Sequence, residues 1–134
     1  MDKLGYISGD LVYIHGSLRI INNCDGYYAT YYDEDEILQE IDVNIIEGIP
    51  LTKEILEKNG WKLHKYHKRN SHDTVFWSSY HKPEEANISL RFYPEEKAFF
   101  LFLYTQEISE TPIRYVHQFQ HILWALDNNV NFKI

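Results

Sequence analysis

The sequence predicts an α+β protein in which a run of short strands precedes a unit with a helix at each end. In residues 1–48, short apolar segments alternate with polar turns, whereas in residues 49–134 two helical patterns flank four longer strand-like segments. The net charge changes at the same place, from −8 in residues 1–48 to +1 in residues 49–134. We therefore expect two domains, residues 1–48 and residues 49–134.

Short apolar segments with polar turns between them make up the first part. They recur at intervals of roughly eight to twelve residues, which is typical of small antiparallel barrels. We predict an acidic SH3-like β-barrel of about five strands, and a long meander within a larger sheet is the alternative. The segments are Leu11–Ile14, Leu18–Ile21, Tyr27–Tyr32, Ile37–Val43 and Ile45-Ile46.

A short helix is expected directly after Pro50, with a signal at each end. Thr52 is placed as its N-cap, and Asn59-Gly60 ends it in a left-handed turn. Leu51, just before the cap, and Leu56, at the fourth helical position, have the spacing of a hydrophobic staple. These signals predict a short helix that begins after Thr52 and ends at Asn59-Gly60.

Consecutive strands are expected next, because polar turns separate the apolar segments that follow. In the third segment Ile88, Leu90 and Phe92 alternate with polar residues, which indicates a sheet with one covered face. The fourth segment is apolar on both sides, so we expect it to be central. The four segments are Trp61–His67, Thr74–His81, Asn87–Tyr93 and Ala98–Tyr104.

A helical pattern closes the chain, and Thr111-Pro112 has the residues that favour a helix start. We expect its apolar stripe to pack on the four-stranded antiparallel sheet, and Asn131–Ile134 to add a short strand. His117 and His121 lie on another face, and we expect them to point outward. The stripe has the three- and four-residue spacing of one helix face: Val116, Phe119, Leu123, Leu126 and Val130.

Composition favours a cytoplasmic protein. The single cysteine, Cys24, cannot form an internal disulfide, which fits a reducing compartment. The longest apolar run, Ala98–Tyr104, is far shorter than the roughly 20 residues of a membrane-spanning helix. A chain of 134 residues has enough apolar surface to fold without metal or disulfide, so we expect no cofactor and no membrane partner.

Two segments carry a resemblance to a family. The chain has Ile49-Pro-Leu-Thr-Lys-Glu-Ile-Leu in its first helix and Tyr115-Val-His-Gln-Phe-Gln in its last, and it opens with Gly9-Asp10-Leu11-Val12. In these features it resembles a family of small uncharacterised proteins of gut anaerobic bacteria that are often associated with prophages or mobile elements. The family pattern has asparagine at the position of His121. The resemblance implies the order of the elements and implies no activity.

The two histidines of the last helix are metal-ligand candidates. Residues at i and i+4 of a helix can share a zinc ion, and the H-E-x-x-H proteases use this spacing with glutamate as general base. Here Gln118 follows His117, so the carboxylate that would activate a water is missing. The spacing of the other potential ligands in the sequence does not indicate a third metal ligand to accompany His117 and His121. We therefore assign no metal and rank a metal-dependent hydrolase third.

Basic and aromatic residues alternate between Trp61 and Arg69. Cations contact phosphates and aromatic rings stack on bases, so single-stranded nucleic acid is a suitable ligand for such a segment. A solvated edge strand gives the same pattern, because edge lysines discourage aggregation, and the overall charge of −7 lowers the prospect of duplex binding. The candidate residues are Trp61, Lys62, Lys65, Tyr66, Lys68 and Arg69.

A tyrosine cluster precedes an acidic turn in the first part. Tyrosine supplies rigid amphipathic contact area, so exposed tyrosines beside anionic residues suit a protein-binding surface. Some of them should point into the barrel as core. The cluster comprises Tyr27, Tyr28, Tyr31 and Tyr32, and Asp33–Glu36 follows it.

The sequence lacks a glycine-rich phosphate loop, a G-x-S-x-G elbow and a Cys-x-x-Cys pair. We therefore predict a non-enzymatic binding or adaptor protein of mobile-element origin that acts through contact with an unknown protein partner. The alternative is a module associated with single-stranded nucleic acid that uses Trp61 to Arg69.

Overall fold

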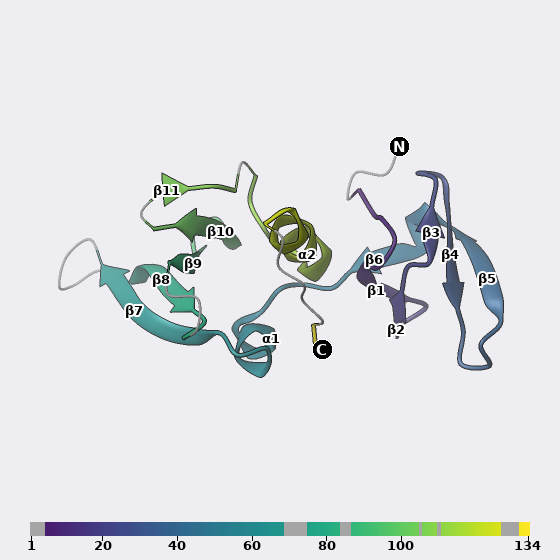
Figure 1. Ribbon diagram of the computed structural model, residues 1–134, viewed down its shortest axis with the longest axis horizontal. Helices are drawn as coiled ribbons and strands as arrows, with labels where there is room; N and C mark the ends of the chain where they lie inside the picture. Colours follow the sequence, from purple (N-terminus) through teal and green to yellow (C-terminus); the bar gives the residue numbers. More distant parts are fainter. Residues whose placement is uncertain (1–4, 69–74, 84–86, 105, 110, 127–131) are drawn as a thin grey trace. The chain divides into compact units, whose positions relative to one another are not determined.

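The structure, a computed structural model, describes residues 5–68, 75–83, 87–104, 106–109, 111–126 and 132–134. Contacts divide the chain into two compact units (Figure 1). The first unit comprises Met1–Pro50 and Tyr115–Val130, and the second comprises Leu51–Arg114 and Asn131–Ile134. The predicted boundary after residue 48 falls near Pro50, but the grouping places the closing helix with the N-terminal residues.

Two three-stranded antiparallel sheets form the first unit, in the orders β2-β1-β6 and β3-β4-β5. Its core contains Val12 and Ile14 from β1 together with Ala29 and Tyr31 from β4. All the predicted apolar segments of the first part supply strands, and a further two-residue strand, Asn23–Cys24, lies between the second and the third of these segments. The strands are β1 (Leu11–Ile14), β2 (Ser17–Ile20), β3 (Asn23–Cys24), β4 (Tyr28–Tyr32), β5 (Leu38–Asp42) and β6 (Ile46–Gly48).

The predicted SH3-like barrel is wrong, because the described strands form separate sheets and do not close on themselves. The chain changes sheets twice. Ile21 N–H donates to the Asp10 carbonyl beside β1, and the next residue, Asn22, donates to the Thr30 carbonyl beside β4. After β5 a 3₁₀ helix, η1 (Val43–Ile45), interrupts the ladder before β6. Tight corners therefore replace the long bent strands that a barrel requires.

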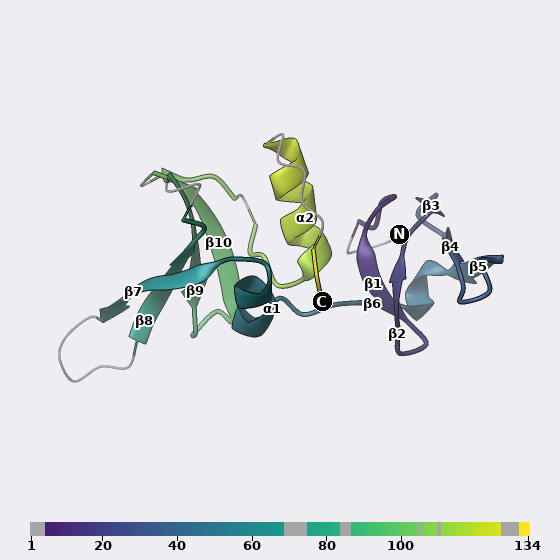
Figure 2. The same ribbon diagram turned by 60° about the horizontal axis from the view of Figure 1, so that its bottom comes forward.

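One five-stranded antiparallel sheet dominates the second unit, in the order β11-β10-β9-β8-β7. Its four longer strands, β7 to β10, are labelled in Figure 2. The four predicted strands are confirmed, but the middle strand is β9, and β10 lies between β9 and the two-residue β11 rather than at the centre. A two-residue strand, β11, was not predicted. Leu90, Phe99 and Leu101 are buried on one face. The strands are β7 (Lys62–Lys68), β8 (Val75–His81), β9 (Ile88–Tyr93), β10 (Ala98–Leu103) and β11 (Gln106–Glu107).

The first predicted helix is confirmed as α1 (Lys53–Lys58) in the second unit. The Thr52 side chain accepts a hydrogen bond from Ile55 N–H at 3.2 Å, which satisfies an amide that the first turn leaves open. Leu56 is fully buried, and Gly60 has a φ of 89°, the left-handed conformation that ends the helix.

The closing helix, α2 (Val116–Ala125), begins four residues later than Thr111-Pro112 predicts. Ile113 forms a bridge with Phe99 beside β10, and both of its backbone hydrogen bonds are made there at 2.8 Å. This extended pairing delays the helix, and Gln118 caps it by accepting from Tyr115 N–H at 3.0 Å.

Of the predicted stripe of α2, Val116, Phe119 and Leu123 are buried, whereas Leu126 is exposed and Val130 lies outside the described residues. Within the first unit the helix contacts β1, where Gln120 Oε1 accepts from Leu11 N–H at 3.1 Å. Packing of this stripe on the second unit's sheet would be a contact between units, so it stays a prediction. Within the described residues, no helix is long and apolar enough to cross a bilayer.

The predicted terminal strand over Asn131–Ile134 is not seen. Asn131 lies outside the described residues, and residues 132–134 have no regular structure. They are instead held by Asn59, whose side chain accepts from Lys133 N–H at 2.7 Å and donates to the Lys133 carbonyl at 2.8 Å.

Candidate functional site

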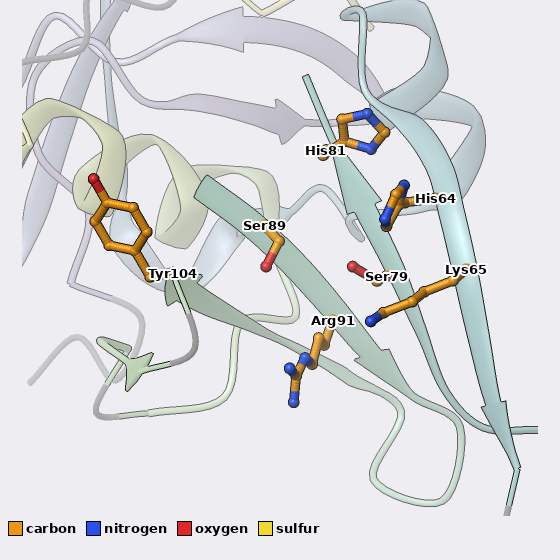
Figure 3. A pocket seen from close by; sticks show the side chains of 7 residues that line it. All are labelled: His64, Lys65, Ser79, His81, Ser89, Arg91 and Tyr104. Atoms are coloured by element: carbon orange, nitrogen blue, oxygen red, sulfur yellow. The ribbon is translucent and has the colours of Figure 1, made fainter. Parts of the chain in front are cut away.

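A pocket of about 280 Å³ lies on the sheet face of the second unit that does not carry the buried leucines. Its lining is polar and rich in nitrogen-bearing side chains, and no carboxylate is among the described lining residues. Figure 3 shows the lining side chains of β7, β8 and β9 together with the residue that follows β10: His64, Lys65, Ser79, His81, Ser89, Arg91 and Tyr104.

Antiparallel pairing brings these side chains together from distant parts of the sequence. Ser79 lies opposite Arg91 on one side and opposite Lys65 on the other. His81 lies opposite Ser89 in the same way. A register irregularity between Leu63 and Lys65 brings His64 to the pocket beside Lys65. Because every second residue of a strand points to the same face, this register gathers the polar residues of three strands.

Aromatic rings hold the Arg91 guanidinium in place. Its central carbon lies 4.2 Å from the ring centroid of Trp77 and 4.0 Å from that of Phe102. The Lys65 ammonium lies 5.7 Å from the same Trp77 ring, and His67 stacks on this indole at 5.0 Å. Aromatic faces attract cations electrostatically, most strongly for tryptophan. Two permanent positive charges therefore converge over one indole at the pocket.

Neither cation has an anionic partner within the part of the chain that the structure describes, where salt bridges join other residues. The rings of His64 and His81 contact each other edge to face, with centroids 4.8 Å apart. The Nδ1 atom of His81 is buried and has no hydrogen-bond partner among the described residues.

The residues that were predicted to bind nucleic acid do not all lie on one surface. Trp61 is only 2% exposed and belongs to the core, so its assignment as a base-stacking residue is wrong. It follows the Gly60 turn directly, which directs its ring inward. Four candidates are exposed on β7, and one of these, Lys65, lines the pocket; Arg69 lies outside the described residues. The exposed candidates are Lys62, Lys65, Tyr66 and Lys68.

Sequence reasoning missed most of the pocket. The polar residues of the third strand segment, Ser89 and Arg91, were visible as one side of an alternation, but a solvent face has the same pattern. No sequence pattern indicated Ser79, His81 or Tyr104, because these residues come together only through the register of the strands. Tyr104 has a φ of 58°, an uncommon conformation for a residue other than glycine, and its ring is 73% exposed.

The predicted tyrosine surface is divided by the pleat of β4. Tyr31 is buried in the core of the first unit, so its assignment to a binding surface is wrong, although the expectation that some of the cluster points inward is confirmed. Tyr27, Tyr28 and Tyr32 are exposed by 69%, 51% and 55%. Leu38, opposite Tyr32 on β5, is also exposed. An aromatic and aliphatic surface thus faces outward from the first unit.

The turns beside this surface are built by carboxylates. Asp25 accepts hydrogen bonds from the N–H groups of Tyr28 and Tyr27, each at 2.8 Å, and these bonds lower the pKa of its carboxyl. Asp33 accepts from Ile37 N–H and from the Gln39 amide, and these two bonds lower the pKa of Asp33. Both groups therefore stay ionised next to the exposed tyrosines.

The histidines of α2 do not both point outward, so that expectation is wrong. His117 is fully buried, with its ring 4.8 Å from that of Tyr6. His121 is partly exposed, and its Nε2 lies 2.7 Å from the carboxylate of the buried Asp10. Asp10 also accepts from Ile7 N–H at 2.8 Å. The pair thus helps to hold α2 to the residues that precede β1.

Within the described residues, no group of three or more His, Cys, Asp or Glu side chains is arranged to hold a metal ion. His117 and His121 therefore gain no described third ligand. Comparisons of the chain with protein-family models, with curated proteins and with solved structures found no match. The resemblance to the family of gut anaerobic bacteria stays a prediction, and the functional argument depends on the geometry of the sites.

Proposed function

We propose that the second unit binds single-stranded nucleic acid, without catalysis, on the sheet face that carries the pocket. The observation that carries this proposal is the position of Arg91. Its guanidinium is held between Trp77 and Phe102, beside Lys65, at the mouth of a pocket without a described carboxylate. A preorganised cation loses little conformational freedom when it contacts a phosphate.

The rest of β7 supports a polymer as the ligand. Lys62 and Lys68 are exposed on the same strand as Lys65, so positive charge continues along its length. Tyr104 is exposed at the pocket, whereas Tyr66, opposite Ser78, lies on the other face of the sheet and does not contribute. A track of cations with an exposed ring is the combination that binds backbone phosphates and stacks on bases without strong sequence preference.

The test is fluorescence anisotropy with a labelled oligothymidylate of roughly 12 nucleotides, a length within the range that single-stranded binding domains cover. We expect saturable binding that weakens between about 50 mM and 200 mM salt, because phosphate contacts release counterions. Arg91→Met keeps an apolar stem between the rings and removes the charge, and we expect it to weaken binding about tenfold or more.

Lys53→Gln is the matched control, because Lys53 is exposed on α1 and does not line the pocket. It should change affinity much less than Lys65→Gln does. Absence of salt-dependent binding by the parent protein would refute the proposal. Equal losses for the two lysine variants would show that net charge, rather than this face, determines the affinity.

A second candidate function is contact with a protein partner through the exposed tyrosines of the first unit. It is favoured by the outward position of Tyr27, Tyr28 and Tyr32 beside ionised carboxylates, since tyrosine is enriched at protein interfaces. The test is a pull-down from host lysate with the parent protein and with a Tyr28→Ser, Tyr32→Ser variant. Recovery of the same proteins by both forms would contradict this candidate.

A further inference from the structure

We propose that the pocket receives a phosphate monoester, the group found at a phosphorylated end of a nucleic-acid strand, rather than an internal phosphodiester. This inference rests on the proposed function and names the part of the ligand that the pocket recognises. Its basis is the charge, the donors and the size of the pocket.

Charge favours a dianion. Lys65 and Arg91 bring two permanent positive charges to the same Trp77 ring, at 5.7 Å and 4.2 Å from its centroid. Both cations thus lie next to one ring, and like charges brought together repel unless an anion lies near both. A phosphate monoester carries about −1.5 to −2 charges at pH 7, whereas each backbone phosphodiester carries one. The monoester therefore neutralises both cations, and the diester leaves part of the repulsion.

The remaining lining residues are suited to the additional oxygen of a monoester. Ser79 and Ser89 offer hydroxyl donors on neighbouring strands, and His64 and His81 offer ring nitrogens. A terminal phosphate has three oxygens that are not bonded to carbon, and each accepts hydrogen bonds strongly. The pocket thus has more donors than the two free oxygens of a phosphodiester require.

The volume of the pocket is consistent with a ligand that is the phosphorylated end of a nucleic-acid strand. Its volume of about 280 Å³ corresponds to roughly nine water molecules at about 30 Å³ each. This space accommodates a phosphate group and an adjoining sugar. The exposed ring of Tyr104 at the edge of the pocket then offers a surface for the base of the terminal nucleotide.

The experiment compares otherwise identical oligothymidylates that carry a phosphate at the 5′ end, at the 3′ end or at neither end. We expect one phosphorylated form to bind about tenfold tighter than the form without a terminal phosphate, the gain from charge-assisted hydrogen bonds. Lys65→Gln and His81→Gln should abolish this preference and retain weaker, salt-dependent binding of the unphosphorylated strand. Lys53→Gln should keep the preference. Circular dichroism verifies that each variant is folded.

The outcomes separate this inference from the proposed function. Equal affinity for all three strands would overturn the monoester site and leave single-strand binding intact. Binding of none of the strands would refute the proposed function. In that case inorganic phosphate and thymidine monophosphate are titrated by calorimetry. Saturable binding that is lost in Lys65→Gln would support a monoester pocket for a small molecule, and no heat with either compound would overturn the pocket as well.

Discussion

The two units use aromatic rings on an open sheet face in opposite electrostatic settings. In the first unit Tyr28 lies opposite Asp42 across β4 and β5, and Tyr32 lies opposite Leu38. In the second unit the rings of Trp77 and Phe102 lie against the guanidinium of Arg91. Both faces offer flat apolar area, but one is bordered by carboxylates and the other by cations. The sign of the neighbouring charge therefore determines which kind of ligand each face is suited to bind.

The charges are also held in different ways. In the first unit backbone N–H groups bond the carboxylates in tight turns, as at Asp25 and Asp33. In the second unit side-chain rings position the cation. Carboxylates fixed in turns already accept hydrogen bonds, whereas the Arg91 donors have no hydrogen-bond partner among the residues that the structure describes. The first face is thus suited to broad contact and the second to a discrete anion.

The largest expected effect tests whether the two units unfold independently of each other. Leu101→Ala removes a fully buried side chain from the second unit and should cost about 2–5 kcal/mol of unfolding free energy. The core cluster of the first unit is built from residues 6–46. Hydrogen exchange should therefore speed up in β7–β10 and change little in β1–β6. Equal acceleration in both would show that the units unfold together.

The second-largest expected effect tests whether Tyr31 belongs to the core while Tyr32 belongs to the surface. Tyr31→Ala should destabilise the first unit by about 3 kcal/mol, because it empties a core position. Tyr32→Ala, one residue away and 55% exposed, should stay within about 0.5 kcal/mol of the parent protein. Chemical denaturation measures both values. Similar losses would mean that Tyr32 also supports the fold, and the surface would lose its status as a free binding face.

A smaller effect is expected at the helix cap of the second unit. Thr52→Ala removes the acceptor for Ile55 N–H and should cost about 1 kcal/mol. Thr52→Ser keeps the oxygen and serves as the control. Denaturation midpoints distinguish the two variants, and equal midpoints would show that the cap does not contribute.

The smallest effect concerns pH and the acidic turns of the first unit. The pKa of Asp33 is lowered by the hydrogen bonds from Ile37 and Gln39. A carboxyl with a lowered pKa in the folded state stabilises the fold above its unfolded pKa, near 3.8, and loses this contribution as the pH falls through the folded value. Asp33→Asn should therefore lower the melting temperature at neutral pH, and the difference from the parent protein should shrink under acid conditions. A difference independent of pH would contradict this account.

Local signals explain what the sequence could predict. Thr52 and Gly60 define the ends of α1, and alternating residues define β9, because caps and alternation depend on neighbouring residues alone. Barrel closure, the late start of α2 and the pocket depend on pairing between distant strands. Arg91 meets Trp77 and Phe102 only through the register of three strands, and Ile113 is extended only because Phe99 pairs with it.

The bridge between Pro50 and Tyr115 has a consequence for the connectivity of the chain. Opposed residues of an antiparallel pair lie about 4.5–5.5 Å apart, so the ends of the 51–114 segment meet. Residues 51–114 therefore form one segment that leaves the first unit and returns to it at the same place. Excision of this segment and its replacement by an Asn-Gly turn would join β6 directly to α2, with Gln120 still placed to bond Leu11. Deletion of everything after Pro50 would remove that bond and the histidine paired with Asp10.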